Sequence, residues 1–372
     1  MSKACGYYKV ESKLYSSKNQ AIYEASKTNQ NITWYFNDDI YDKCLAIRKL
    51  GNCDLDSLYK LRALQLRETY DYLILNYSGG PDSHNILMTF LNNNIKLDEI
   101  HVKFSSTVDS KIYKPNKVNI NSENIHSEYD YAIKPVLEKL KITHPDIKID
   151  IHDIFINIPN ITYDTFLTAP SHYLGAFELL RQSKYSNSVT KQIDKGKKVA
   201  DIYGIDKPLI IFKDNSFFTL FMDTMVSVAG NRHDNIELFY WTPDMPELAL
   251  EQAFKLYEFF KKNPKLLHLI DASIRKANDF SRIELLRKIG ITTIYTTWNL
   301  NTFQVTKPMN YKNSGRTRDK YYIQHKEFDN YIRDYNYYSH VYGSTLNSKY
   351  FDLKFMQNKT FYSKWYKLGE IT

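Results

Sequence analysis

The residue types best suited to chemistry stand together in one short run of the chain: Ser78, Gly79, Gly80, Pro81, Asp82 and Ser83. The two glycines permit unusual φ values and let the backbone approach a ligand without a Cβ in the way. The proline has no N–H, but a position in the first turn of a helix loses nothing by that. The two serines add hydroxyl donors. If a helix begins here, its exposed N–H groups and its dipole would hold an anion such as pyrophosphate.

Asp82 needs a separate explanation, because a carboxylate beside phosphates repels them unless a cation lies between. Its charge suits the N-terminus of a helix, and we assign this side chain to Mg²⁺. A metal ligand at a helix start would face solvent and make little contact with the core. We therefore expect the loss of Asp82 to impair chemistry far more than folding.

A second polar run begins at Gly204 and ends at Pro208, directly after an expected strand. It would lie at the carboxyl edge of the sheet, where ligands bind in open α/β folds. Gly204 would lie beside the ligand, Asp206 would share the metal, and Lys207 would neutralise charge on a leaving pyrophosphate. For Asp206 and Lys207, an interpretation without direct phosphate contact is equally consistent.

Three other polar segments have less specific patterns. The lysine pair at 197–198 is interpreted as a solvated basic turn before a strand. The run 232–234, Arg-His-Asp, would serve acid–base chemistry, but a lone His–Asp pair is more often a surface turn. The basic and tyrosine-rich stretch 307–322 would close over an anionic substrate or touch nucleic acid, although a solvated face is the favoured interpretation.

The elements that must position these residues follow from hydrophobic periodicity. Residues 72–77 are almost continuously apolar, as strands covered by helices on both faces tend to be. A helical pattern follows the two glycines and stops at Asn92. Further strands are expected at 100–104, 147–151 and 199–203, with helices at about 125–140, split at Pro135, and from about Pro170. Strands that alternate with helices predict the α/β class, with a doubly wound parallel sheet.

The rest of the chain divides into three predicted parts. Residues 1–53 would form a small N-terminal α+β module, residues 54–242 the α/β domain that binds the nucleotide, and residues 243–372 a mainly helical C-terminal region. The elements expected outside the parallel sheet are two short strands around Glu11, a helix 17–28, a strand 32–36, a helix 54–70, a hairpin 209–221, and helices 247–262 and 273–289, the last stopped by Gly290.

The Ser-Gly-Gly-Pro-Asp-Ser run between a strand and a helix resembles the Ser-Gly-Gly-x-Asp-Ser motif of the PP-loop, or N-type, ATP pyrophosphatases. These belong to a superfamily of adenine nucleotide α-hydrolase-like proteins, which includes asparagine, GMP and NAD synthetases, tRNA thiolation and lysidine enzymes, and sulfonucleotide reductases. The resemblance covers residues 70–104, and similarity of fold would extend to about Pro208. It implies a Rossmann-like sheet that binds ATP and Mg²⁺, with adenine beside Phe104 and Ser105. A purely structural place for Phe104 in the core is equally consistent.

The implied chemistry is adenylation: an oxygen of an acceptor attacks the α-phosphorus, and pyrophosphate leaves into the loop. Ammonia, an amine or another nucleophile then releases AMP, as in a ligase or transferase. One alternative is a non-catalytic protein that binds a nucleotide or nucleic acid. Another is a sulfonucleotide-binding protein of the reductase-like branch that lacks its redox cysteine.

The positions of the cysteines, the net charge and the length of the apolar runs limit the possible functions. The three cysteines are Cys5, Cys44 and Cys53, all before the loop, which disfavours a disulfide framework, a zinc site and cysteine-dependent sulfur chemistry. A net charge of +8 favours anionic partners, nucleotide or nucleic acid. No apolar run is long enough to span a bilayer and no signal core is apparent, so we expect a cytoplasmic protein without a membrane partner.

Overall fold

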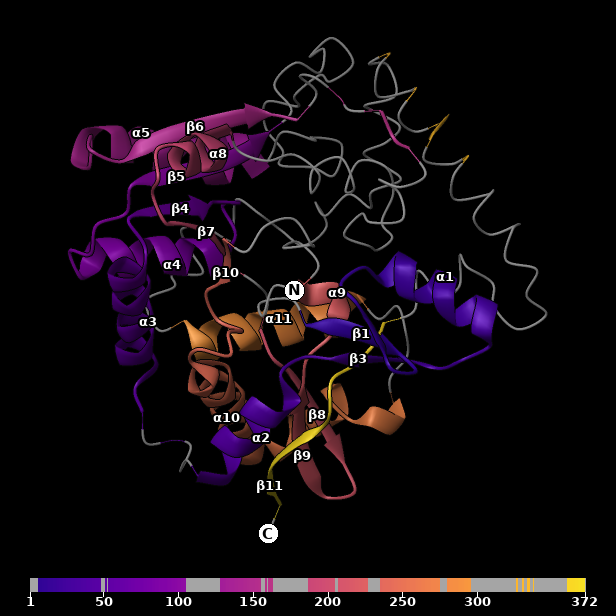
Figure 1. The fold of residues 1–372 in the computed structure, drawn as a ribbon. Coiled ribbons are helices and arrows are strands. Elements are labelled where there is room, and N and C mark those ends of the chain that lie inside the picture. The colour runs from indigo at the N-terminus through magenta and orange to yellow at the C-terminus, as the bar shows by residue number, and fades with distance from the viewer. Residues whose placement is uncertain are drawn as a thin grey trace.

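The computed structural model of the chain (Figure 1) describes most of the segments that the sequence assigns to helices and strands. It describes residues 6–47, 51, 53–104, 128–154, 158, 160–162, 187–204, 207–226, 235–274, 280–295 and 360–371, with single positions between 326 and 337. The helix expected from Pro170 lies outside these residues.

A five-stranded parallel sheet forms the centre of the α/β part, in the order β10-β7-β4-β5-β6. Four of its strands confirm the prediction, and β10 is an addition of only three residues, too short for alternation to reveal. The strands are β4 (Tyr72–Asn76), β5 (Glu99–Phe104), β6 (Lys148–Asp153), β7 (Val199–Tyr203) and β10 (Ile236–Leu238).

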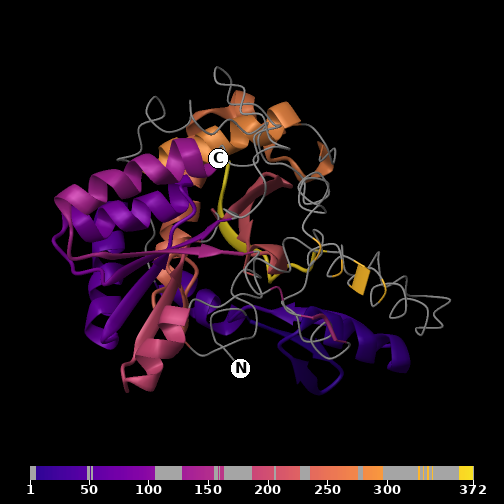
Figure 2. The same cartoon turned by 90° about the horizontal axis from the view of Figure 1, so that it is seen from above.

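Helices cover both faces of this sheet, with α4 and α5 on one face and α8 on the other (Figure 2). Strand β4 is accordingly buried on both sides: Leu73 and Leu75 join the main core, whereas Tyr72 and Ile74 pack with Val189 of α8. The helices are α3 (Leu55–Thr69), α4 (Pro81–Asn92), a π-helical turn (Glu128–Ile133) that leads into α5 (Lys134–Thr143), and α8 (Asn187–Asp194). The split that the sequence predicts at Pro135 corresponds to the change from π-helix to α-helix between Ile133 and Lys134.

Strand order identifies one special place in the sheet. From β4 the chain moves outward through β5 to β6, then returns to β7 on the other side of β4 and continues to β10. The order therefore reverses between β4 and β7. At such a point the two connecting segments leave toward opposite faces of the sheet, and a crevice forms outside the carboxyl ends of the strands.

The N-terminal segment is α+β, as its pattern predicts. Its antiparallel sheet has the order β2-β1-β3, from β1 (Tyr7–Val10), β2 (Lys13–Tyr15) and β3 (Ile32–Tyr35), with α1 (Lys18–Thr28) and α2 (Asp38–Ile47). Helix α2 was not predicted from the sequence.

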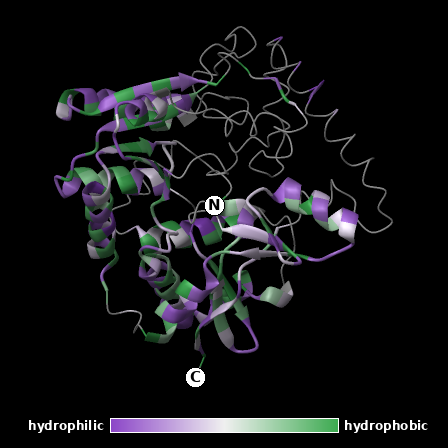
Figure 3. Ribbon diagram, viewed as in Figure 1, coloured by the Kyte–Doolittle hydropathy of each residue, from purple (hydrophilic) through white to green (hydrophobic). Residues whose placement is uncertain are grey.

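A third sheet joins the predicted hairpin to the C-terminal end of the chain, in the order β11-β9-β8. The hairpin, β8 (Leu209–Lys213) and β9 (Ser216–Leu220), confirms the prediction, whereas β11 (Tyr366–Glu370) was not expected. Phe221, after β9, packs on Phe36 of the N-terminal module, with ring centroids 5.0 Å apart. Apolar residues predominate in strands such as β4 and β8, whereas α1 mixes many polar residues with a few apolar ones (Figure 3).

The described C-terminal helices are α10 (Pro246–Lys262) and α11 (Phe280–Ile294), with short α9 (Asp223–Val226) and two 3₁₀ turns (Pro264–Leu269, Ala272–Ile274). The expected helix 273–289 is wrong at both ends, because α11 begins at Phe280 and continues through Gly290. The helix continues beyond Gly290 because the buried side chains of Ile291 and Ile294 pack in the core. Among the described residues, no helix is long and apolar enough to cross a membrane.

Candidate functional site

The Ser78–Ser83 run lies where strand order reverses, between the end of β4 and the start of α4. Gly79 has φ +69°, in the left-handed region that favours glycine, and a Cβ there would lie 2.8 Å from Cγ1 of Ile133. Pro81 occupies the first turn of α4. The sequence therefore predicts the strand, the turn and the helix start correctly.

The two serine hydroxyls fasten the loop to the helix that follows. The Ser78 N–H donates to Oγ of Ser83 at 3.2 Å, and the Ser83 hydroxyl donates to the Gly80 carbonyl, also at 3.2 Å. The Ser78 and Ser83 hydroxyls are themselves 3.2 Å apart. These bonds fix the shape of the turn, in which Ser78 is exposed while Gly79 and Gly80 are buried.

The N-terminus of α4 lacks a capping side chain, since Gly80 is its N-cap residue. The first-turn N–H groups of Asp82 and Ser83 therefore have no acceptor within the helix, and they add to the positive end of its dipole. Gly204, after β7, lies against this turn: a Cβ there would come within 3.0 Å of the Ser83 nitrogen. The structure thus brings Gly204 to the loop as the sequence predicts.

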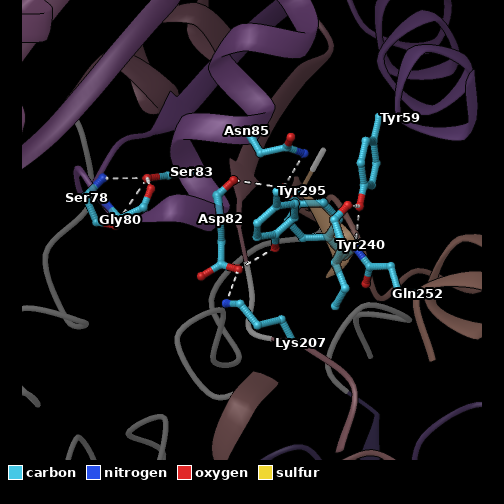
Figure 4. A network of polar contacts seen from close by, with 11 residues as sticks. Tyr59, Ser78, Gly80, Asp82, Ser83, Asn85, Lys207, Tyr240, Gln252 and Tyr295 are labelled. Atoms are coloured by element: carbon cyan, nitrogen blue, oxygen red, sulfur yellow. Dashed lines mark hydrogen bonds and ion pairs between the residues drawn. The ribbon is translucent and has the colours of Figure 1, made fainter. Parts of the chain in front are cut away.

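Asp82 forms an ion pair with Lys207 across this edge of the sheet (Figure 4). Nζ of Lys207 lies 2.6 Å from Oδ1 of Asp82, and the Tyr295 hydroxyl donates to the same oxygen. The aspartate side chain is 20% exposed and that of the lysine 10%. The expectation of a solvent-facing Asp82 is therefore wrong, because Lys207 after β7 and Tyr295 directly after α11 cover one of its oxygens.

Gly290 explains how Lys207 reaches the aspartate. A Cβ on Gly290 would lie 3.2 Å from Cδ of Lys207, so the aliphatic part of the lysine passes along the open side of helix α11. The sequence predicts this glycine to be a helix stop. Its structural role is close approach, the other use that proteins make of glycine.

The sequence predicted neither Tyr240, which holds the backbone of Asp82, nor Tyr295, which holds its carboxylate. The Tyr240 hydroxyl donates to the Asp82 backbone carbonyl at 2.8 Å and accepts from Nδ2 of Asn85 at 3.1 Å. Burial raises the pKa of both tyrosines well above the usual value, so both remain neutral donors. They are distant from the loop along the chain, and no local pattern marks them.

The surroundings of the Asp82 carboxylate can be compared with what a bound Mg²⁺ ion would require. Mg²⁺ in nucleotide sites is usually held by one or two carboxylates together with the substrate phosphates and water. Oδ1 of Asp82 is occupied by Lys207 and Tyr295, whereas Oδ2 makes no hydrogen bond or ion pair with the described residues and points away from both (Figure 4). One free carboxylate oxygen fits this requirement. Within the described part of the chain, no three His, Cys, Asp or Glu residues gather to form a protein-only metal cage, and Asp206 lies outside it.

The remaining residues predicted for the site lie in different places. Phe104 ends β5 half-buried, and its ring stacks on Tyr129 with centroids 3.9 Å apart. The lysines at 197–198 precede β7, at the opposite end of the sheet from the loop, where Lys197 lies 4.8 Å from the Tyr72 ring. This agrees with a basic turn. Ser105, the run 232–234 and the stretch 307–322 lie outside the described residues.

Two histidines lie beside the loop, His101 buried and His84 half-buried. His101 of β5 lies 3.3 Å from Oδ1 of Asn76, the last residue of β4, through its Nδ1. His84 of α4 lies 3.1 Å from the Tyr77 hydroxyl. Burial is the main reason that the pKa of each histidine falls to about 4. They make the neighbourhood of the loop sensitive to acid.

No protein-family model, no curated protein and no solved protein structure matches the chain.

Proposed function

We propose that the protein binds ATP at the Ser78–Ser83 turn and is an AMP-forming ATP pyrophosphatase of the PP-loop type, with a Rossmann-like doubly wound fold. The observation that carries this proposal is the uncapped N-terminus of α4 at the reversal of strand order, with Lys207 held beside it. Backbone N–H groups, a helix dipole and a cation converge there. That combination is suited to a polyphosphate.

Each part has a role in the proposed reaction. The turn and the first-turn N–H groups of α4 would bind the β- and γ-phosphates, which become the leaving pyrophosphate. Lys207 would contact the same oxygens and neutralise the charge that develops as the bond between the α-phosphorus and the bridging oxygen breaks. The new bond joins the α-phosphorus to an oxygen of the acceptor, and a second nucleophile then releases AMP. Catalysis would consist mainly of positioning and electrostatics.

Asp82 is the residue that would hold Mg²⁺ in this proposal, through Oδ2. Bound there, the ion would screen the phosphates from the carboxylate and add positive charge beside the leaving group. Gly204 would contribute close backbone approach, and Phe104 an apolar surface near the adenine. Asp206 as a second metal ligand stays a prediction.

The direct test is a titration with labelled ATP in the presence and absence of Mg²⁺, followed by assays for AMP and pyrophosphate. Metabolite and nucleic-acid fractions supply candidate acceptors. We expect Mg²⁺-dependent binding and release of both products when a fraction contains the acceptor. Failure to bind ATP would refute the proposal. Binding without AMP under every acceptor condition would favour a non-catalytic nucleotide-binding protein, and tighter binding of adenylyl-sulfate would favour the reductase-like branch.

Lys207→Met provides a local test, and Lys197→Met is its matched control. Both lysines flank β7 and lie near a tyrosine ring, at 5.5 Å for Lys207 with Tyr295 and 4.8 Å for Lys197 with Tyr72, but at opposite ends of the strand. Loss of a direct phosphate contact should weaken ATP binding about tenfold or more in Lys207→Met. The control should bind like the parent. Equal effects would show that the carboxyl edge is not the phosphate site.

A further inference from the structure

Three tyrosines from distant parts of the chain form a buried cluster against the start of α4. They are Tyr59 of α3, Tyr240 after β10 and Tyr295 after α11, with ring centroids between 5.7 and 6.3 Å apart. All three side chains are almost completely buried. The cluster therefore holds α3, α11 and the segment after β10 in fixed positions relative to the loop.

The three hydroxyl groups of this tyrosine cluster have different acceptors (Figure 4). Tyr59 donates to the carbonyl of Ile294 at 3.0 Å, which fixes the residue just before Tyr295. Tyr240 donates to the backbone carbonyl of Asp82, and only Tyr295 donates to the carboxylate. Tyr295 is thus the one member of the cluster whose hydroxyl acts on the charged group.

The bond from Tyr295 determines which carboxylate oxygen remains available. Lys207 and Tyr295 both contact Oδ1, from two directions, and Oδ2 points away from both donors (Figure 4). A lysine is flexible, and it would be drawn toward bound phosphates. A buried phenol attached to a fixed helix end keeps its direction, so its bond would persist when Lys207 moves.

We propose that Tyr295 is a positioning residue: it holds Oδ1 of Asp82, so that Oδ2 faces the divalent cation that accompanies ATP. The inference rests on the proposed function and adds the determinant of metal affinity to it. Tyr59 would support the same arrangement indirectly by holding Ile294. Tyr295 itself would touch neither the metal nor the nucleotide.

Tyr295→Phe and Tyr240→Phe are a matched pair for the test. Each removes one buried hydroxyl that donates to Asp82, and each keeps its ring in the cluster. Only the first alters the carboxylate. Mn²⁺ replaces Mg²⁺ as the probe, and the signal of free Mn²⁺ in electron paramagnetic resonance reports its binding in the presence of α,β-methylene-ATP.

We expect Tyr295→Phe to weaken Mn²⁺ binding about tenfold, the usual scale for a hydrogen bond to a charged group. Tyr240→Phe should remain within about twofold of the parent, and both variants should bind the nucleotide analogue equally in metal-free buffer. In an Asp82→Asn background, Tyr295→Phe should have no further effect on Mn²⁺ binding, since the carboxylate is then absent.

Two results would overturn the positioning role while leaving ATP binding intact. One is an equal loss of Mn²⁺ affinity in Tyr295→Phe and Tyr240→Phe, which would indicate a general disturbance of α4. The other is a full effect of Tyr295→Phe in the Asp82→Asn background. A parent protein that binds neither the analogue nor Mn²⁺ would overturn the proposed function, and this inference with it.

Discussion

Two lysine–aspartate pairs of the described residues, Lys18–Asp223 and Lys207–Asp82, differ in burial and in how fully the carboxylate is satisfied. Lys18 lies 2.8 Å from Oδ2 of Asp223, and the two side chains are 0% and 1% exposed. Tyr8 donates to the same oxygen at 2.9 Å, and the Phe361 N–H donates to Oδ1 at 2.9 Å. Both oxygens of Asp223 are therefore occupied.

The pair at the loop leaves part of its carboxylate unused. Oδ1 of Asp82 has two donors, whereas Oδ2 has none among the described residues, and the side chain keeps 20% of its exposure. A satisfied buried pair fixes structure, because it joins the N-terminal module, α9 and the C-terminal segment at one point. A partly satisfied pair beside an uncapped helix can still accept a ligand. A lysine–aspartate pair can therefore stabilise the fold or leave an oxygen available to a ligand, depending on the groups that surround it.

The largest expected effect is a loss of unfolding free energy when the Lys18–Asp223 pair is broken. Asp223→Ala would leave Lys18 buried without its counter-ion, which typically costs about 3–5 kcal/mol. Asp82→Ala should cost distinctly less, because this pair is less buried than Lys18–Asp223 and only one of its carboxylate oxygens has donors. Urea denaturation at pH 7 measures both, with Asp194→Ala on an exposed position of α8 as the control. Equal losses for Asp223→Ala and Asp82→Ala would remove the distinction between the two pairs.

The second effect is on catalysis, at the loop pair. Asp82→Asn keeps the shape of the side chain and removes its charge, so AMP formation should fall about a hundredfold or more at ordinary Mg²⁺, equivalent to roughly 2.7 kcal/mol in the barrier. Asp82→Ala should be similarly impaired. Asp223→Asn should lose activity only in proportion to unfolded protein. Near-normal AMP release by the Asp82 variants would leave the loop as a binding feature only.

Acid should also weaken the sheet beside the loop, progressively as the pH falls. His101 and His84 have pKa values lowered to about 4 in the fold, against 6.5 in a free chain. Between these values the unfolded chain binds protons that the folded state does not, so stability is fully present above pH 6.5 and is lost as pH falls toward 4. The slope is about 1.4 kcal/mol per pH unit for each histidine.

Unfolding free energies between pH 7 and pH 5 test this expectation. His101→Gln should have a shallower pH dependence than the parent, and so should His84→Gln. A parent whose stability does not change over this interval would show that the histidines are accessible to protons in the folded state. That result would contradict the burial from which the lowered pKa values arise.

Replacement of the cysteines should have the smallest effect of all. Cys44 is buried in α2, which packs against α10 at a distance from the loop (Figure 1), and Cys53 is half-buried before α3. A variant with Ala at Cys5, Cys44 and Cys53 should form AMP within about twofold of the parent, and lose only a modest part of its stability. Loss of AMP formation with ATP binding retained would instead indicate cysteine-dependent sulfur chemistry.

The sequence by itself determined the elements whose causes are local. The apolar run of β4, the turn at Gly79, the helix start at Pro81 and the β8–β9 hairpin each follow from residues within a few positions of one another. Backbone sterics, helix periodicity and alternation act over that range, so the position of the loop could be predicted, and with it the approach of Gly204 and Lys207 to the same edge of the sheet.

Tertiary structure alone decided what surrounds Asp82. Lys207, Tyr240 and Tyr295 are 125, 158 and 213 positions away from it. Their contacts arise because the segments after β7, β10 and α11 meet at the start of α4, and neither periodicity nor a motif encodes which side chains meet there. Gly290 was predicted to end a helix, but it lies within α11 and leaves room for Lys207. A glycine can end a helix or allow a close approach, because it has no side chain. Which of the two occurs depends on the element that packs beside it.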